Sequence, residues 1–148
     1  MANITSTYQR DANRVPITNL GLTATKSITY SASTTGATGA TTLFTVTGLV
    51  NIRLMAVCST SLTGSGTIEA GISGATAIAI AQTTGTDIDT GEIWLDTTPA
   101  TNEAYPSGII LNGSDIIQTI ATNTLTAGVL KYFCIWSPIS SDGNVSAA

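Results

Sequence analysis

Apolar and polar residues alternate along much of the chain, which is the period-2 pattern of half-buried β-strands. The clearest examples are the runs 43–47 and 50–58, which are joined at Gly48. Phe44 and Val46 share one face of the first run, and the second run has an apolar residue at every other position. Glycine adopts positive φ without a steric penalty, so Gly48 predicts a tight hairpin between two strands at the centre of the core.

A second hairpin is predicted in the later half of the chain. The dipeptide Asn112-Gly113 separates the apolar runs 109–111 and 115–122. Asn and Gly both accept the positive φ values of a type I′ turn, so Asn-Gly between apolar runs is a strong hairpin signal. With the other short alternating runs, spaced by roughly 8 to 12 residues, the pattern predicts about eight or nine strands and no helix.

The run 129–136 is the most hydrophobic of the predicted strands. Four large side chains share one of its faces, whereas Phe133 and Ile135 lie on the opposite face with Lys131. A strand that is apolar on both faces is expected to be covered on both sides. We therefore expect the opposite sheet on one side of it and another subunit or a loop on the other.

These signals predict an all-β protein whose main part is one antiparallel β-sandwich or jelly roll. Three segments are expected: an extended N-terminal arm over residues 1–25, the sandwich over 26–139 and a polar C-terminal tail over 140–148. The arm lacks both periodicities but contains β-branched and aromatic residues, which favours an ordered segment over a frayed terminus. A second interpretation adds part of the arm, near residues 17–22, to the domain as a strand.

Charged residues form only 9% of the sequence, against about 25% in an average soluble protein. The net charge of −4 argues against nucleic-acid binding, which needs a basic patch. The charges are also separated along the chain. Arg10, Arg14 and Lys26 lie early, whereas the segment 87–103 contains five of the nine acidic residues. These two segments could meet between copies of the protein.

No secretory signal or membrane span is predicted. The first residues, MANITSTYQRDANRVP, contain no apolar h-region, and nowhere do 18 or more apolar residues run together. We therefore expect a soluble protein made in a cytoplasm. Cys58 and Cys134 fall inside predicted strands and are expected to be buried, unbonded thiols, with a cross-strand disulfide as the alternative.

The sequence contains no histidine, which removes the usual base of Ser-His-Asp and Cys-His nucleophile systems. Two alternatives use the acidic stretch. Paired carboxylates among Asp87, Asp89, Glu92 and Asp96 could hydrolyse a glycoside, and the first three could bind Ca²⁺. The stretch lacks a full calcium-loop pattern, so a solvated acidic loop is favoured. No catalytic residue, metal, cofactor or small-molecule substrate is predicted.

Four aromatic residues are candidates for a carbohydrate-binding platform: Trp94, Tyr105, Tyr132 and Trp136. Aromatic side chains on strands more often belong to the core, and only Tyr105 is expected in a loop. A host-glycan-binding module is therefore kept as an alternative to a structural role.

Three stretches resemble small structural proteins of tailed bacteriophages: TTLFTVTGLVNIRLMAV, DTGEIWLD and ILNGSDIIQTIATNTLTAGVLKYFCIWSPIS. The resemblance runs from about Leu43 to Ser140. It implies a virion component similar to capsid decoration, or cement, proteins, which are commonly trimers of jelly-roll or tulip-like β-domains on the outside of the head. It implies no active-site residues. A tail, neck or fibre-base component is the alternative within the same class.

The expected partners are the major capsid protein and other copies of the chain in a homotrimer, with no nucleic acid or membrane. The protein is expected on the outer capsid surface after synthesis in the host bacterial cytoplasm. The arm would grip the capsid, with Arg10 and Arg14 pairing with its acidic groups. The residues predicted to contact the capsid or a neighbouring subunit are Tyr8, Arg10, Arg14, Ile17, Leu20, Phe133 and Ile135.

Overall fold

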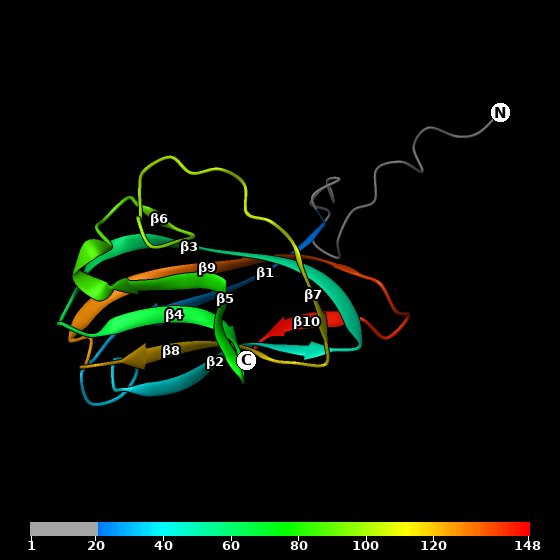
Figure 1. Ribbon diagram of the computed structural model, residues 1–148, viewed down its shortest axis with the longest axis horizontal. Helices are drawn as coiled ribbons and strands as arrows, with labels where there is room; N and C mark the ends of the chain where they lie inside the picture. The colour runs from blue at the N-terminus through cyan, green and yellow to red at the C-terminus, as the bar shows by residue number, and fades with distance from the viewer. Residues whose placement is uncertain (1–20) are drawn as a thin grey trace.

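Ten strands form two antiparallel sheets in residues 21–148, the part of the chain that the computed structural model describes (Figure 1). In chain order, the strands are β1 (Leu22–Thr29), β2 (Gly39–Thr47), β3 (Leu49–Thr63), β4 (Thr67–Ile72), β5 (Ala75–Thr84), β6 (Ile93–Trp94), β7 (Ile109–Asn112), β8 (Ile116–Ala121), β9 (Ala127–Pro138) and β10 (Asn144–Ala147). One 3-10 turn, η2 (Gly85–Asp87), follows β5. The all-β prediction is confirmed, as is the prediction of two antiparallel sheets.

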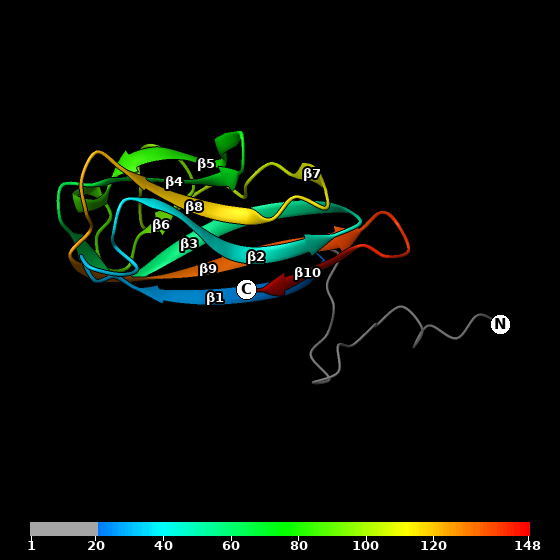
Figure 2. The ribbon, with the colours of Figure 1, turned by 90° about the horizontal axis from the view of Figure 1, so that it is seen from below.

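The two sheets pack face to face as separate layers (Figure 2). The first sheet has the order β1-β9-β3-β6, and β7 also pairs with β3. The second sheet has the order β10-β2-β8-β4-β5. Most connections carry the chain from one sheet to the other; within the described residues, only β4–β5 and β6–β7 join consecutive strands of one sheet.

The two predicted hairpins are wrong, although both glycines do make turns. Gly48, with φ 60°, joins β2 of the second sheet to β3 of the first. Gly113, with φ 63°, carries the chain back from β7 to β8. The two crossings lie together, since the Gly113 N–H donates to the Gly48 carbonyl over 2.9 Å. A crossing between sheets needs the same positive φ as a hairpin turn, so local sequence cannot distinguish them.

The structure also corrects both segment boundaries. β1 begins at Leu22, inside the segment assigned to the arm, and its first residue pairs with Trp136 of β9. The predicted polar tail contains β10, which pairs with β2 along the edge of the second sheet. Val145 of β10 is buried, so this strand adds to the core.

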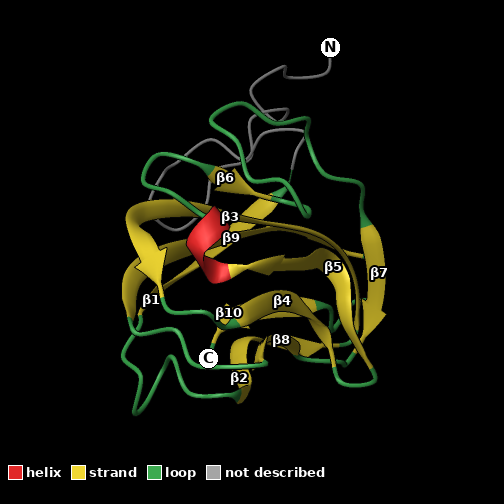
Figure 3. Ribbon diagram, turned by 60° about the vertical axis from the view of Figure 1, so that its left-hand side comes forward, coloured by secondary structure: helices red, strands yellow, loops and turns green. Residues whose placement is uncertain are grey.

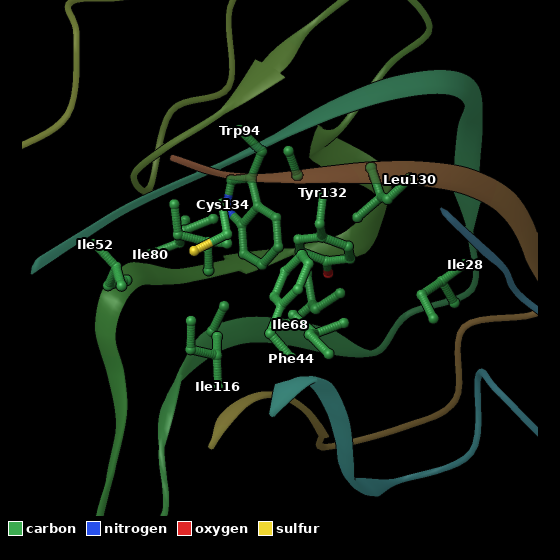
Figure 4. Packing of buried hydrophobic residues seen from close by; sticks show 14 of the residues in the cluster. Ile28, Phe44, Ile52, Ile68, Ile80, Trp94, Ile116, Leu130, Tyr132 and Cys134 are labelled. Atoms are coloured by element: carbon green, nitrogen blue, oxygen red, sulfur yellow. The ribbon is translucent and has the colours of Figure 1, made fainter. Parts of the chain in front are cut away.

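The core lies between the two sheets, where large side chains from both converge (Figure 4). Trp94 and Tyr132 are fully buried and meet edge to face, with ring centroids 6.3 Å apart. Cys58 and Cys134 are buried and unbonded, as predicted. They lie four residues apart along the β3–β9 ladder, because Leu54 pairs with Cys134 and Cys58 pairs with Leu130.

A buried polar cluster links the layers. The Tyr30 and Tyr132 hydroxyls come from the side of the first sheet, and both lie within hydrogen-bond distance of Gln118 Oε1 on β8, at 2.8 and 2.9 Å. Burial disfavours the phenolate, so the pKa of each tyrosine is raised. At the layer edge, Lys26 Nζ donates to the carbonyls of Thr42 and Ala148 at 2.9 and 2.7 Å, which joins the same two sheets.

Candidate interaction surface

The outer face of the first sheet presents a group of apolar side chains that the core does not enclose. β3 and β9 alternate between buried and partly exposed residues along their length. On the outward side, Met55 is paired with Phe133 and Arg53 with Ile135. Phe133 and Ile135 therefore lie where the sequence pattern placed them, and their proposed role in contacts stays a prediction.

A long loop, residues 95–108, continues this surface beyond β3. Figure 3 shows β6 and this loop lying on the same side of the sandwich as β3 and β9. The loop begins with a backbone pair between Ile93 and Ala100, with N···O distances of 2.7 and 3.2 Å. Near its end, Gly108 lies so close to Asn51 that an added Cβ would be 2.5 Å from the Asn51 Oδ1 atom. A larger residue at this position would therefore require the Asn51 side chain to move.

Tyr105 is the aromatic residue that this loop brings onto the outer face. The Arg53 guanidinium carbon lies 5.0 Å from the centroid of the Tyr105 ring, which is a cation–π contact. Tyr105 remains 45% exposed, and Ile110, on the outward side of β7, is 66% exposed. We call Met55, Tyr105, Ile110, Phe133 and Ile135 together the apolar outer face.

A groove separates the loop from β5, the edge strand of the second sheet, whose one strand partner within residues 21–148 is β4. Its volume is about 380 Å³, and a second hollow of about 130 Å³ beside Met55 shares five of its lining residues. We call the larger hollow the β5 groove. Its walls are Ile78 and Ala79 on one side and residues of the loop on the other. Ile78 is 51% exposed, so an apolar side chain of the edge strand faces solvent here.

The charge of the β5 groove is negative. Asp96 and Glu103 are among its lining residues, and none of the described residues that line it is lysine or arginine. Asp96 Oδ1 also accepts hydrogen bonds from the N–H and hydroxyl of Thr98 at 2.7 and 2.9 Å. Close by, the Nε atom of Arg53 is buried without a hydrogen-bond acceptor among the described residues. The region therefore combines apolar walls, two carboxylates and one unsatisfied donor.

The structure brings only part of the acidic stretch to this groove. Glu92 instead accepts a hydrogen bond at 2.8 Å from the backbone N–H of Asp89, within the turn that precedes β6. Asp87 lies in η2 and does not line the groove. Among residues 21–148, no three His, Cys, Asp or Glu side chains are grouped so that they could hold a metal ion.

The four aromatic residues considered for a sugar platform do not gather at the surface. Trp94, Tyr132 and Trp136 are buried in the core, and Tyr105 alone is exposed. The Tyr105 ring contacts the Arg53 guanidinium, and within residues 21–148 no other aromatic side chain is classed as exposed.

The other predicted contact residues fall outside the described part of the chain: Tyr8, Arg10, Arg14, Ile17 and Leu20.

Sequence reasoning also missed residues that the structure adds to the candidate surface. Arg53 and Met55 could have been found, since they occupy the non-core face of an alternating strand. No comparable signal marks Ile78 or Ile110, whose surroundings depend on segments distant in the sequence.

No protein-family model, curated protein or solved structure matches this chain. Within residues 21–148, no helix has the length and apolar character needed to cross a membrane.

Proposed function

We propose that this protein is a non-enzymatic structural component of a bacteriophage virion, which binds the outside of the capsid as a decoration or cement protein and stabilises the head. The observation that carries the proposal is the apolar outer face. Four of its five side chains lie on strands of one sheet and Tyr105 lies on the adjoining loop, so together they can meet a protein surface, and exposed apolar groups of this kind typically mark interaction sites. The sequence resemblance to small phage structural proteins supports the same role.

We also propose that the sandwich is a jelly roll. A jelly roll has eight strands in two sheets, built from two Greek keys. The orders β1-β9-β3-β6/β7 and β2-β8-β4-β5, with repeated crossing between the sheets, are consistent with that topology if β6 and β7 count as one interrupted strand. β10 is then an addition beside β2.

In this proposal, the partners are the major capsid protein and two further copies of the chain. The N-terminal arm grips the capsid, and the apolar outer face meets a neighbouring subunit. Contacts through three arms would raise the overall affinity by roughly 10² to 10⁴ over that of one arm. The low charge of the sequence suits a protein whose surface is largely covered by neighbours.

The test uses phage heads that lack the protein. Purified protein is titrated onto the heads, and the occupancy is measured by cosedimentation. We expect saturation at a fixed ratio and heads that withstand higher temperature. Deleting residues 2–20, which leaves β1 complete, should abolish attachment while the thermal unfolding of the isolated domain is preserved.

Unchanged occupancy after the deletion would overturn the role of the arm. Failure of the full-length protein to bind heads would overturn the decoration role itself. Binding to purified tails or necks in the same assay would move the protein to the alternative position within the virion.

A host-glycan-binding module is the second candidate. The observation in its favour is the exposed Tyr105 ring beside the carboxylates of the β5 groove, because sugars stack on aromatic rings and donate hydroxyl groups to acids. A glycan array tests it directly. Binding that is lost in Tyr105→Ala, with heads left unbound, would favour this candidate.

A further inference from the structure

The β5 groove has the properties of a site for an extended peptide segment. One wall is an edge strand whose outer side has no strand partner within the described residues, so it can pair with an added strand. Exposed apolar side chains, Ile78 and Tyr105, stand on opposite walls and could enclose alternate side chains of such a segment. The groove therefore fits a polypeptide backbone better than a small rigid ligand.

The charges of the groove indicate which kind of segment would bind. Asp96 and Glu103 favour a basic occupant. Three of the five cationic residues are already engaged by the domain: Lys26 with backbone carbonyls, Arg53 with Tyr105, and Lys131 with the Phe133 ring at 5.1 Å. The other two, Arg10 and Arg14, belong to residues 1–20.

The start of the described chain lies close to the groove. One row of paired residues crosses the first sheet from Leu22 through Trp136 and Ile52 to Ile109, which lines the groove. Three strand spacings separate the ends of this row, or about 14 Å. Arg14 is seven residues before Gly21, and an extended chain of that length spans about 23 Å at ~3.3 Å per residue. Arg14 can therefore reach the groove of its own chain.

We propose that residues 1–20 bind across the apolar outer face of their own domain and into the β5 groove, with Arg10 and Arg14 beside Asp96 and Glu103. The segment also covers Phe133 and Ile135 without a partner protein. The short span favours the same chain over a second copy, because the tether keeps the effective concentration of the segment in the millimolar range.

This inference does not rest on the proposed function, since it concerns the isolated protein. If both hold, attachment to a head replaces the groove carboxylates with acidic groups of the capsid.

Limited trypsin digestion of the full chain tests the groove. Docking should slow cleavage after Arg14, and Asp96→Asn combined with Glu103→Gln should accelerate it about fivefold, as expected for the loss of two exposed ion pairs. Glu69→Gln is the matched control, because Glu69 lies on the outer face of the other sheet and contacts Gln82. Equal cleavage rates in the double variant, the control and the unchanged protein would overturn the proposal.

Paramagnetic NMR identifies the occupant. A nitroxide on Ala12→Cys is prepared in ¹⁵N-labelled protein, while Cys58 and Cys134 are protected by burial. We expect broadening of the amides of residues 103–107 that persists when unlabelled protein is added. A second sample mixes spin-labelled ¹⁴N protein with ¹⁵N protein that carries no nitroxide. Broadening of the ¹⁵N protein in that second sample, together with its loss from the first sample on dilution, would assign the groove to a second copy. No broadening in either sample would exclude the segment, and each of these results overturns the proposal.

Discussion

The outer faces of the two sheets differ in the side chains that they present. On the first sheet, the central outward positions are mainly apolar, with Met55 beside Phe133 and Ile135 beside Arg53. The corresponding positions on the second sheet are mainly polar: Thr42, Glu69, Ile117 and Thr119. A hydroxyl-bearing face is stable in water, whereas a contiguous apolar face is favoured only where something covers it. Among the described residues, this difference favours the outer side of the first sheet over that of the second as the proposed contact surface.

The inner faces differ in a related way. The buried groups that can titrate come from the strands of the first sheet or directly follow them: Tyr30, Cys58, Tyr132 and Cys134. Burial raises the pKa of all four, and it raises that of Cys134 to about 12. The second sheet contributes Gln118, a neutral amide that hydrogen-bonds with both tyrosines. The sheet that bears the apolar outer face is therefore also the one sensitive to alkaline pH.

The largest expected effect comes from removing the apolar outer face. Phe133→Ser combined with Ile135→Ser should weaken head binding about a thousandfold, because the contact between subunits is lost and with it the avidity of the three arms. Ile117→Ser, on the outer face of the second sheet, is the matched control and should leave binding unchanged. Cosedimentation measures both variants, and thermal unfolding verifies that they fold. Equal effects of the two substitutions would break the comparison between the faces.

The second largest effect is expected from the buried polar cluster, and it tests whether this cluster couples the two sheets. Gln118→Ala should lower the free energy of unfolding by about 3 kcal/mol, because it leaves a cavity and removes the acceptor shared by the two tyrosines. Thr119→Val changes the adjacent, outward residue, whose hydroxyl has no partner within the described residues, and should cost little. Urea unfolding compares the two variants. A small cost for Gln118→Ala would mean that the polar cluster does not couple the layers.

The loss of stability at alkaline pH tests whether the titrating groups belong to the first sheet. The folded state holds the tyrosines neutral, so their contribution to stability is complete below the unfolded pKa of about 10 and is lost as pH rises through the folded pKa. Above pH 10, each tyrosine that stays protonated in the fold contributes a slope of about −1.4 kcal/mol per pH unit. Tyr132→Phe should remove one such contribution from urea unfolding measured between pH 10 and 11. An unchanged slope would show that Tyr132 ionises without unfolding.

The smallest effect concerns the edge where the two sheets meet. Lys26→Met keeps most of the apolar stem but removes the donor to the carbonyls of Thr42 and Ala148. Because Lys26 is partly exposed, we expect a loss of about 1 kcal/mol. Thermal unfolding of the variant and the unchanged protein measures this loss. Equal melting temperatures would show that these hydrogen bonds do not contribute to stability.

Much of the candidate surface follows from alternation along single strands. Phe133 and Ile135 could be placed on the outer face because they alternate along the strand with residues that face the core. Tyr105, Ile78 and Asp96 could not be assigned to one groove, because they come from different segments of the chain. Their proximity depends on the crossing of residues 95–108 over β3.

The sequence alone determined where most of the strands lie and where the chain turns at Gly48 and Gly113, because side-chain alternation and positive φ are local properties. The start of β1 and the short strand β10 were missed, because neither has a clear alternating pattern. Gly48 and Gly113 show the limit of that information. Both adopt positive φ, as predicted, yet each turn passes between sheets instead of closing a hairpin. Only the tertiary structure decided which strands pair, since hydrogen bonding between distant segments and burial of both inner faces select the partners. The β5 groove follows from that pairing.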